Sequence, residues 1–330
     1  MKQTALSSIC AVLVLLTSCS ESDSPGGYTP GEPMAVQFSM TMEPVVGLTR
    51  TLITDTTLPI TAECGKQIGI YGIRTEAECI DTLEWQTADD GIFQHPLRNC
   101  PYNIEAGNAL VPDSVEAYYP MGGNPAMAVY AYWPLKRDTL IEGYGAVVPI
   151  DLTLQEDILY TGKVSSVCQA GTDNAIINLP FKHALGAFSF KFAADQPIYL
   201  ENRWLEKVEL ITTYSLDDAW MRVADGSFVF PFGQTPDTLS IDLQGKAMEL
   251  SVLQTHLLGS VLLVPGMGLK AIRLFVQYNE EEFVYTIDIA EESLFTIEPG
   301  VLQSVTFRLS EAPVSLETRS SCSDLIFTLE

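Results

Sequence analysis

The chain has 330 residues, 47% of them hydrophobic, and carries 42 acidic against 18 basic residues, for a formal net charge of −24. This length suits about two domains of roughly 150 residues each, and the apolar fraction excludes wholesale disorder. The charge balance argues against nucleic acid as a partner, because phosphate binding uses clustered Lys and Arg and the sequence has no such cluster.

The first residues, MKQTALSSICAVLVLLTSCSESDS, have the organisation of a secretory signal. Lys2 precedes a short apolar run, which cannot remain as a helix across a bilayer of roughly 30 Å. The step LTSC, ending at Cys19, also resembles the lipobox of bacterial lipoproteins, in which the cysteine is acylated and becomes the first residue. We expect a signal peptide over residues 1–18, a lipidated Cys19 and a flexible leash over residues 19–34. The alternative is an ordinary signal with a coincidental cysteine.

The remaining cysteines give no dense disulfide framework. Cys10 lies in the signal, and five scattered cysteines without a CxxC pair follow Cys19. One or two bridges are compatible with an oxidising compartment, and their pairing stays open. The five are Cys64, Cys79, Cys100, Cys168 and Cys322.

A period of two marks the first expected strand, AVQFSMTME. One face carries the apolar side chains Val36, Phe38, Met40 and Met42. Polar side chains alternate with them, as in a half-buried strand. A loop with Pro44, Gly47 and Pro59 follows, and it contains Arg50.

Further strands are expected at Ile68–Ile73, Ala126–Trp133 and YGAVVPIDL, and on both sides of PFKHALG at Ala175–Leu179 and Ala187–Phe192. The second half continues with WLEKVELITTY, GSFVFPF, TLSIDLQG, SVLLVPG, KAIRLFVQYN, EFVYTIDIA and QSVTFRLS. Short strands at spacings of about 8 to 12 residues predict an all-β chain of β-sandwiches. We place the domains at residues 35–182 and 183–330, and we expect VPGMGLK to form a hairpin turn.

The last sixteen residues, SLETRSSCSDLIFTLE, add one more expected strand after the domain already looks closed by GVLQSVTFRLS. Leu325, Phe327 and Leu329 alternate with their neighbours, as in a half-buried strand. Chain ends usually fray, so an apolar strand at this end needs a partner that holds it.

Motifs for catalysis or metal binding are missing. The histidines His95, His183 and His256 form no HExxH or HxH pattern, and the sequence has no GxSxG, P-loop or GxGxxG motif. The acidic clusters lack the spacing of a calcium loop. We therefore expect no enzyme activity, metal or cofactor. Two carboxylates brought together by the fold for glycoside hydrolysis remain open, and the tyrosines near residues 118–132 are expected in the core rather than on a sugar-binding surface.

Several blocks, taken in order, resemble the fimbrillin-like family, the subunits of type V pili. They are the lipobox at Cys19, GLTRT around Arg50, GKQIGIYGI, DILYTGKV, INLPFKHALGAFSFKF and IEPGVLQSVTFRLS. The chain departs from the family where TAECGKQ replaces the usual Trp and Gly-Asp before the IGIY strand.

The resemblance implies two transthyretin-like β-sandwich domains in tandem, lipoprotein export to the outer membrane, and a cell-surface fimbrium that supports adhesion. An arginine-specific protease would cut between Arg50 and Thr51 and free the first strand, residues 35–44. A strand from the next subunit would then fill the vacated groove.

The donated strand is expected within residues 314–330, with Leu325, Phe327 and Leu329 on its apolar face and Val314 and Leu316 as a preceding piece. The implied partners are other pilus subunits, the protease, the outer membrane through the lipid, and a host or bacterial surface ligand.

Three alternatives stay open at this point. The tail can pack as an edge strand on its own domain. The protein can be a lipid-anchored module that stays monomeric and captures a glycan or a host protein. A secreted glycan-active enzyme is the third. The position in the pilus and the ligand are also open.

Overall fold

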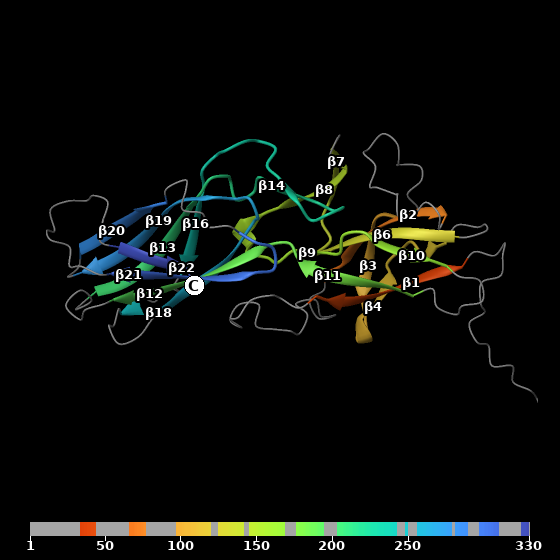
Figure 1. Cartoon of the computed structure of the whole chain (residues 1–330), viewed down its shortest axis with the longest axis horizontal. Helices are drawn as coiled ribbons and strands as arrows, with labels where there is room; N and C mark the ends of the chain where they lie inside the picture. The colour runs from red at the N-terminus through yellow and green to blue at the C-terminus, as the bar shows by residue number, and fades with distance from the viewer. Residues whose placement is uncertain are drawn as a thin grey trace, which may run out of the picture.

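The computed structural model describes residues 34–43, 66–76, 97–119, 125–141, 145–168, 176–194, 203–242, 248–249, 256–278, 281–289, 297–309 and 325–329. Cys19, Arg50, Thr51, Val314 and Leu316 lie outside the described residues. The described part consists of strands with two short 3-10 turns and contains no α-helix, which confirms the expected all-β class. Within it, no helix is long and apolar enough to cross a membrane. Figure 1 shows an elongated molecule with the early strands at one end and the late strands at the other.

The early strands form one sheet that closes on itself. Its ring order is β6-β2-β3-β4-β1-β11-β9, and β9 pairs back with β6 through Tyr132↔Tyr160 and Trp133↔Leu159. The ring strands are β1 (Ala35–Met42), β2 (Ile68–Glu76), β3 (Leu97–Ile104), β4 (Ala109–Pro112), β6 (Pro125–Trp133), β9 (Leu159–Tyr160) and β11 (Ile176–His183). Outside the ring, β10 (Val164–Val167) pairs with β6, and β5 (Ala117–Tyr118) pairs with β1. We call this unit the barrel.

Strand β6 explains how the barrel connects to the rest of the chain. All nine of its residues are buried, because alternate side chains face two different cores. Met127 and Val129 belong to the barrel interior, whereas Tyr130 and Tyr132 pack outside it with residues of β8 (Gly145–Ile150). Its nearly continuous apolar sequence is therefore that of a strand covered on both faces.

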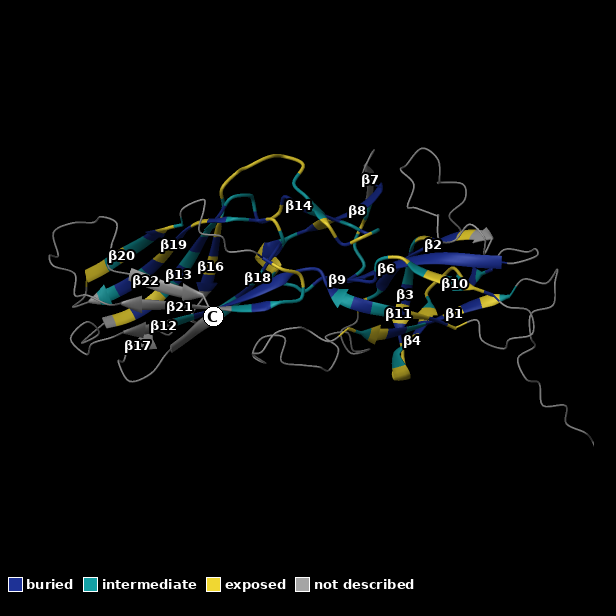
Figure 2. Ribbon diagram, viewed as in Figure 1, coloured by how far each residue is buried: buried dark blue, intermediate teal, exposed yellow. Residues whose placement is uncertain are grey.

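The late strands form two sheets that share a core. One has the order β18-β12-β21-β22, and the other has the order β16-β13-β19-β20 with β17 beside β13. Phe188 and Phe190 of the first sheet pack in one cluster with Leu210 and Leu274 of the second, and Figure 2 shows buried residues on β13 and β16. The strands are β12 (Gly186–Ala194), β13 (Arg203–Thr212), β16 (Thr238–Asp242), β17 (Met248–Glu249), β18 (His256–Leu263), β19 (Leu269–Tyr278), β20 (Glu281–Asp288), β21 (Leu302–Leu309) and β22 (Leu325–Leu329). We call this unit the sandwich.

A smaller sheet combines strands from both halves of the chain. Its order is β15-β14-β8-β7, where β14 (Ala219–Arg222) pairs with β8, and β15 (Phe228–Val229) and β7 (Thr139–Ile141) form the edges. The chain itself passes from barrel to sandwich between β11, which ends at His183, and β12, which begins at Gly186. A side chain at position 186 is excluded, since a Cβ there would lie 2.6 Å from the carbonyl oxygen of Glu298. Short 3-10 turns occupy Ala106–Asn108 and Leu152–Leu154.

Two features differ from the sequence expectations. The N-terminal half forms one hydrogen-bonded ring rather than two separate facing sheets, because the short strand β9 pairs with β6 through two residues. In VPGMGLK the turn is present, with Met267 N–H donating to the Val264 carbonyl at 3.0 Å. The expected hairpin was wrong, since β18 pairs with β12 whereas β19 pairs with β13 and β20.

Candidate functional site

The first strand, β1, lies inside the barrel wall and has neighbours on both sides. It runs parallel to β11 over six residue pairs, from Gln37↔Ile176 to Met42↔Phe181. On the other side it runs antiparallel to β4 through Phe38↔Leu110 and Ser39↔Ala109. Just beyond its end, Glu43 N–H donates to the Phe181 carbonyl at 2.7 Å. The space that β1 fills between β11 and β4, here called the slot, is thus bordered by two ladders of backbone groups.

The inward face of β1 fills the barrel core with the predicted period of two. Val36, Phe38 and Met40 are buried, and Met40 is 1% exposed. The Phe38 ring stands edge-on to Tyr102, with ring centroids 5.3 Å apart and planes at 83°. Met42, the fourth predicted residue, is half-buried and packs against the same cluster. At about 1.5–3 kcal/mol for each buried side chain, the three inner residues contribute about 5–9 kcal/mol.

The outward face of β1 is polar and is bound by one amide. Ser39 donates its hydroxyl to Asn178 Oδ1 at 3.3 Å, and Asn178 Nδ2 donates to the Thr41 hydroxyl at 3.1 Å. Asn178 lies directly opposite Ser39 in the β1–β11 ladder. This contact couples the outer surface of β1 to β11 without adding buried apolar area.

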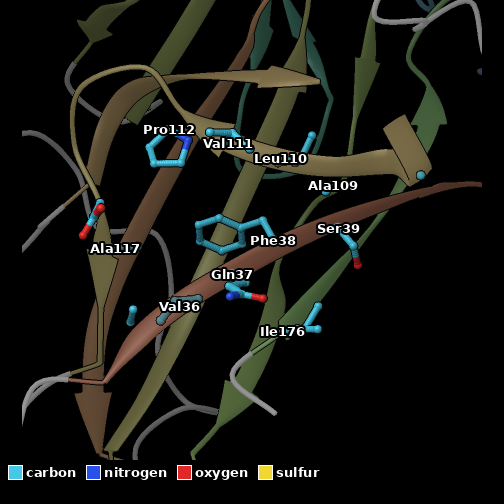
Figure 3. A pocket seen from close by; sticks show the side chains of 13 residues that line it. Val36, Gln37, Phe38, Ser39, Ala109, Leu110, Val111, Pro112, Ala117 and Ile176 are labelled. Carbon is cyan, nitrogen blue, oxygen red and sulfur yellow. The ribbon is translucent and has the colours of Figure 1, made fainter. Parts of the chain in front are cut away.

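A groove of about 570 Å³ lies over the N-terminal half of β1 (Figure 3). It forms where β1 passes from its pairing with β4 to its pairing with β5. Its exposed lining includes Ala35, Gln37, Ala109, Val111 and Ile176. Two large apolar side chains therefore face water beside a glutamine: Ile176 is 54% exposed and Val111 is 37% exposed. Periodicity alone could not reveal this groove, because it depends on how two short strands diverge.

The C-terminal strand β22 lies on its own chain at the edge of the sandwich. It pairs antiparallel with β21 over five residue pairs, from Val305↔Leu329 to Leu309↔Leu325. Among the described strands it has one neighbour, whereas β21 is also paired in parallel with β12 over eight residue pairs. The strand expected at Leu325, Phe327 and Leu329 is thus present as backbone, in an edge position.

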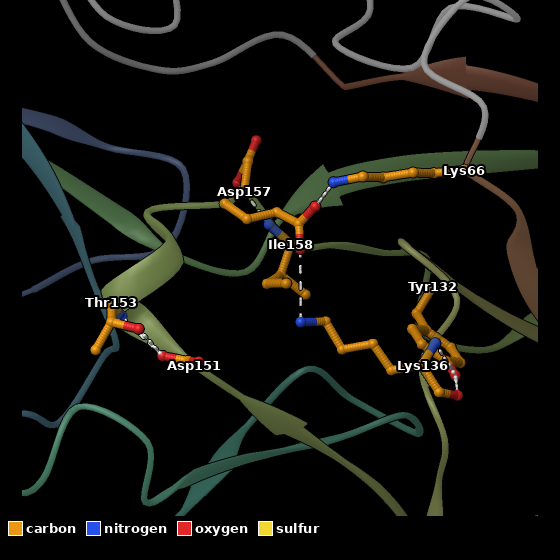
Figure 4. Close-up of polar contacts among 8 residues, drawn as sticks. Lys66, Tyr132, Lys136, Asp151, Thr153, Asp157 and Ile158 are labelled. Carbon is orange, nitrogen blue, oxygen red and sulfur yellow. Dashed lines mark hydrogen bonds and ion pairs between the residues drawn. The ribbon is translucent and has the colours of Figure 1, made fainter.

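Charged side chains gather where the segment containing Arg50 rejoins the barrel (Figure 4). Lys66, the first described residue after that segment, forms an ion pair with Glu156, and Lys136 Nζ lies 3.6 Å from the same carboxylate. Burial lowers the pKa of Lys136. Next to Glu156, Asp157 Oδ2 lies 2.6 Å from Nδ1 of the buried His183 at the end of β11. These contacts fix the start of β2 and the end of β11 at the same end of the barrel.

Other candidate chemistry is structural where it is described. Within the described ranges, no three His, Cys, Asp or Glu residues gather to hold a metal ion. Cys100 and Cys168 are free and buried in the barrel, and burial raises the pKa of both thiols. Tyr119, Tyr130, Tyr132 and Trp133 are buried and Tyr118 is half-buried, so the tyrosines that were expected in the core mostly lie there.

The geometry defines an all-β protein in which the first strand is one wall of a closed barrel and the last strand is a sandwich edge. A family model described as fimbrillin-like matches residues 49–324, and the chain belongs to this family. The resemblance found in the sequence is thereby confirmed. Membership supports a pilus or adhesion protein with a structural role rather than an enzyme.

The chain matches several solved structures over most of its length. The chain is similar to a candidate cell adhesion protein from Bacteroides ovatus ATCC 8483, with 18% identity, a TM-score of 0.53, and coverage of 91% of this chain and 96% of that chain. It is also similar to a fimbrial assembly protein from Parabacteroides distasonis ATCC 8503, with 10% identity, a TM-score of 0.43, and coverage of 91% and 96%. A further match is the fimbrial anchor protein Mfa2 from Porphyromonas gingivalis, with 10% identity, a TM-score of 0.36, and coverage of 84% and 91%. The search of curated proteins gives no match.

Proposed function

We propose that the protein is a structural fimbrial subunit that is assembled by strand exchange. It is exported as a lipoprotein acylated at Cys19, cut by an arginine-specific protease between Arg50 and Thr51, and joined head-to-tail to other subunits at the cell surface. The supporting observation is that the strand preceding Arg50 fills an interior position of the barrel. The polymer supports adhesion, and the two domains, residues 35–182 and 183–330, supply the slot and the donated strand.

The position of Arg50 suits release of the first strand. It lies between β1, which ends at Met42, and β2, which begins at Ile68, and these strands are separated in the ring by β3 and β4. After a cut at Arg50, β1 has no covalent link to the rest of the barrel, so non-covalent contacts alone retain it. The cut removes residues 19–50 from the acylated precursor.

An empty slot favours the arrival of another strand. Loss of β1 removes about 5–9 kcal/mol of apolar burial and leaves β11 and β4 as sheet edges with unpaired backbone groups. An extended segment with the same period of two restores both contributions by strand addition. The tail carries that period at Leu325, Phe327 and Leu329. It has one described neighbour at home, and it would have one on each side in the slot of another copy.

Donation between copies produces a filament. The slot lies in the barrel and the tail lies on the sandwich, so the two surfaces that meet are different. A head-to-tail contact of this kind forms a ring only if the rotation from one copy to the next brings the last copy back to the first. Otherwise the contact repeats and the copies form a fibre.

The test uses full-length precursor, an arginine-specific protease and detergent gels. Wild type should lose the mass of residues 19–50 and then form ladders that survive detergent. Arg50→Ala should stay folded and uncut, and Arg137→Ala, at another exposed arginine, should be processed like wild type. Normal mature subunit from Arg50→Ala would place the cut elsewhere.

Deletion of residues 324–330 tests the donor. It should abolish the ladders while the monomer stays folded, because β21 remains paired with β12. Unchanged ladders would assign the tail to its own sandwich and exclude it as the donated strand.

One observation favours the rival function, a lipid-anchored module that stays monomeric and captures a glycan or a host protein. Phe232 is 76% exposed and stands edge-on to Trp220, with ring centroids 6.4 Å apart. Exposed aromatic rings of this kind are common anchors at interfaces. A protein that keeps its acylated end, stays one band after protease treatment, and loses surface binding on Phe232→Ala would support this rival.

A further inference from the structure

We infer that the tail of a second copy enters the slot parallel to β11, with Phe327 in the place of Phe38 and Ile326 filling the groove above the place of Gln37. This register rests on the strand exchange proposed above. It specifies direction, alignment and the role of the groove, none of which follows from exchange as such.

The inward side chains of the two strands match one for one. The sequence VQFSM of β1 aligns with LIFTL of the tail, so that Leu325, Phe327 and Leu329 replace Val36, Phe38 and Met40. The central residue is phenylalanine in both. A ring in this position keeps the edge-to-face contact that Tyr102 makes with Phe38. Leucine at the two flanking positions keeps apolar side chains of similar volume in the barrel core, and such exchanges cost little.

The first outward side chain of the tail fits the apolar groove beside β1. In this alignment Ile326 replaces Gln37, whose ladder partner is Ile176. Val111 follows Leu110, which pairs with Phe38 on the other side of β1, and lines the same groove as Gln37. Ile176 and Val111 are exposed in the lining of a groove of about 570 Å³, to which Gln37 also contributes. An isoleucine there buries three apolar side chains together, so the tail gains a contact that β1 does not make.

The next outward position preserves a hydrogen bond. Thr328 replaces Ser39, whose hydroxyl donates to Asn178 Oδ1. Threonine carries the same donor and has a higher strand propensity. The two outward residues of the tail thus match two different surroundings, one apolar and one polar.

The same two residues select the direction. A reversed tail keeps Phe327 in the centre but exchanges Ile326 and Thr328, which places the hydroxyl over the apolar groove and the isoleucine beside Asn178. A shift by one residue turns Ile326 and Thr328 into the core and Phe327 out to water. Both alternatives lose contacts that the parallel register makes.

Disulfide trapping tests the register. Two copies are mixed in a Cys322→Ser background, one carrying Ile326→Cys and the other Ile176→Cys, and the arginine-specific protease is added. Neighbouring strands place paired Cα atoms about 4.8 Å apart, within the range of a disulfide. We expect a cross-linked pair of copies under oxidising conditions, and a much lower yield when Thr328→Cys replaces Ile326→Cys.

The outcomes separate the register from the exchange. A higher yield from Thr328→Cys would overturn the parallel direction, and ladders without either cross-link would overturn the register, while strand exchange stands in both cases. Absence of ladders from the processed wild type would refute the exchange, and the register with it.

A peptide measurement tests the groove separately. The synthetic octapeptide SDLIFTLE, residues 323–330, should block ladder formation by the processed chain. The Ile326→Gln peptide should need about tenfold higher concentration, whereas the Thr328→Ser control keeps the hydroxyl and should act like the parent peptide. Equal potency of the Ile326→Gln peptide would show that the groove contributes nothing to strand capture.

Discussion

Replacing Phe38 by alanine should weaken the barrel in the uncut protein. The ring is 2% exposed and lies edge-on to Tyr102 at 5.3 Å in the centre of β1. Removing a buried phenylalanine costs about 3–5 kcal/mol, of which the edge contact accounts for about 0.5–1.5 kcal/mol. Domains are stable by about 5–15 kcal/mol, so a large share of the barrel's stability depends on this side chain.

Hydrogen–deuterium exchange measures the effect locally, since the barrel and the sandwich can then be followed separately. Protection of barrel amides in β3 and β11 should fall by about two to three and a half orders of magnitude, and amides in β13 and β19 should keep theirs. Phe232→Ala is the matched control, because its ring is 76% exposed and its loss should change stability by less than about 0.5 kcal/mol.

Phe38→Ala should have no effect on the stability of the barrel once strand exchange is complete. In the proposed polymer the slot holds the tail of another copy, so Phe38→Ala should leave barrel protection unchanged and Phe327→Ala should reduce it. Equal loss of protection from Phe38→Ala in precursor and polymer would mean that β1 stays in place, and the exchange would be refuted.

The remaining predictions concern the fold. Gly226→Ala should destabilise the protein by more than about 1 kcal/mol, since φ is +72° and the new Cβ would lie 2.2 Å from the Tyr160 ring. The control is Gly107→Ala, where φ is +79° and the new Cβ meets open space, so that only backbone strain is added. Equal melting temperatures of the two variants would contradict this prediction. Burial, followed by the hydrogen bond to Asp138, raises the pKa of Tyr71, so the folded state holds a proton that the unfolded state loses. The resulting stability is fully present below pH of about 10 and is lost as the pH rises above it. Tyr71→Phe should therefore reduce the decrease in the free energy of unfolding with pH, measured by urea unfolding at pH 8 to 11. An unchanged pH dependence would contradict this role of Tyr71.

Strands with an uninterrupted period of two could be predicted from the sequence. β1 is the clearest example, because Val36, Phe38 and Met40 alternate with polar residues and all three are buried. Met42 is half-buried because it lies at the last residue of the strand. The strand expected at Leu325, Phe327 and Leu329 was also found, although its place at a sandwich edge could not be derived from its own period.

Strands with an interrupted period were missed. In β3, Asn99 has a left-handed φ of 48°, and the register to β2 shifts between Ile70 and Gly72, so the apolar residues of LRNCPYNI do not alternate regularly. Closure of the barrel was missed for a different reason. It depends on β9, which has two residues, and so short a strand carries no period.

In the strand exchange proposed above, the loss of β22 and the loss of β1 have different costs. Removing β22 leaves β21 paired with β12 over eight residue pairs, so β21 becomes the edge strand of the sandwich in place of β22. Removing β1 opens a ring, because β11 and β4 both lose a neighbour and the barrel gains two edges where it had none at that point. Removing the tail from its sandwich therefore costs less free energy than leaving the slot of the barrel empty. In the proposed exchange, a processed copy with an open barrel is therefore the acceptor, and a copy that still carries its tail is the donor.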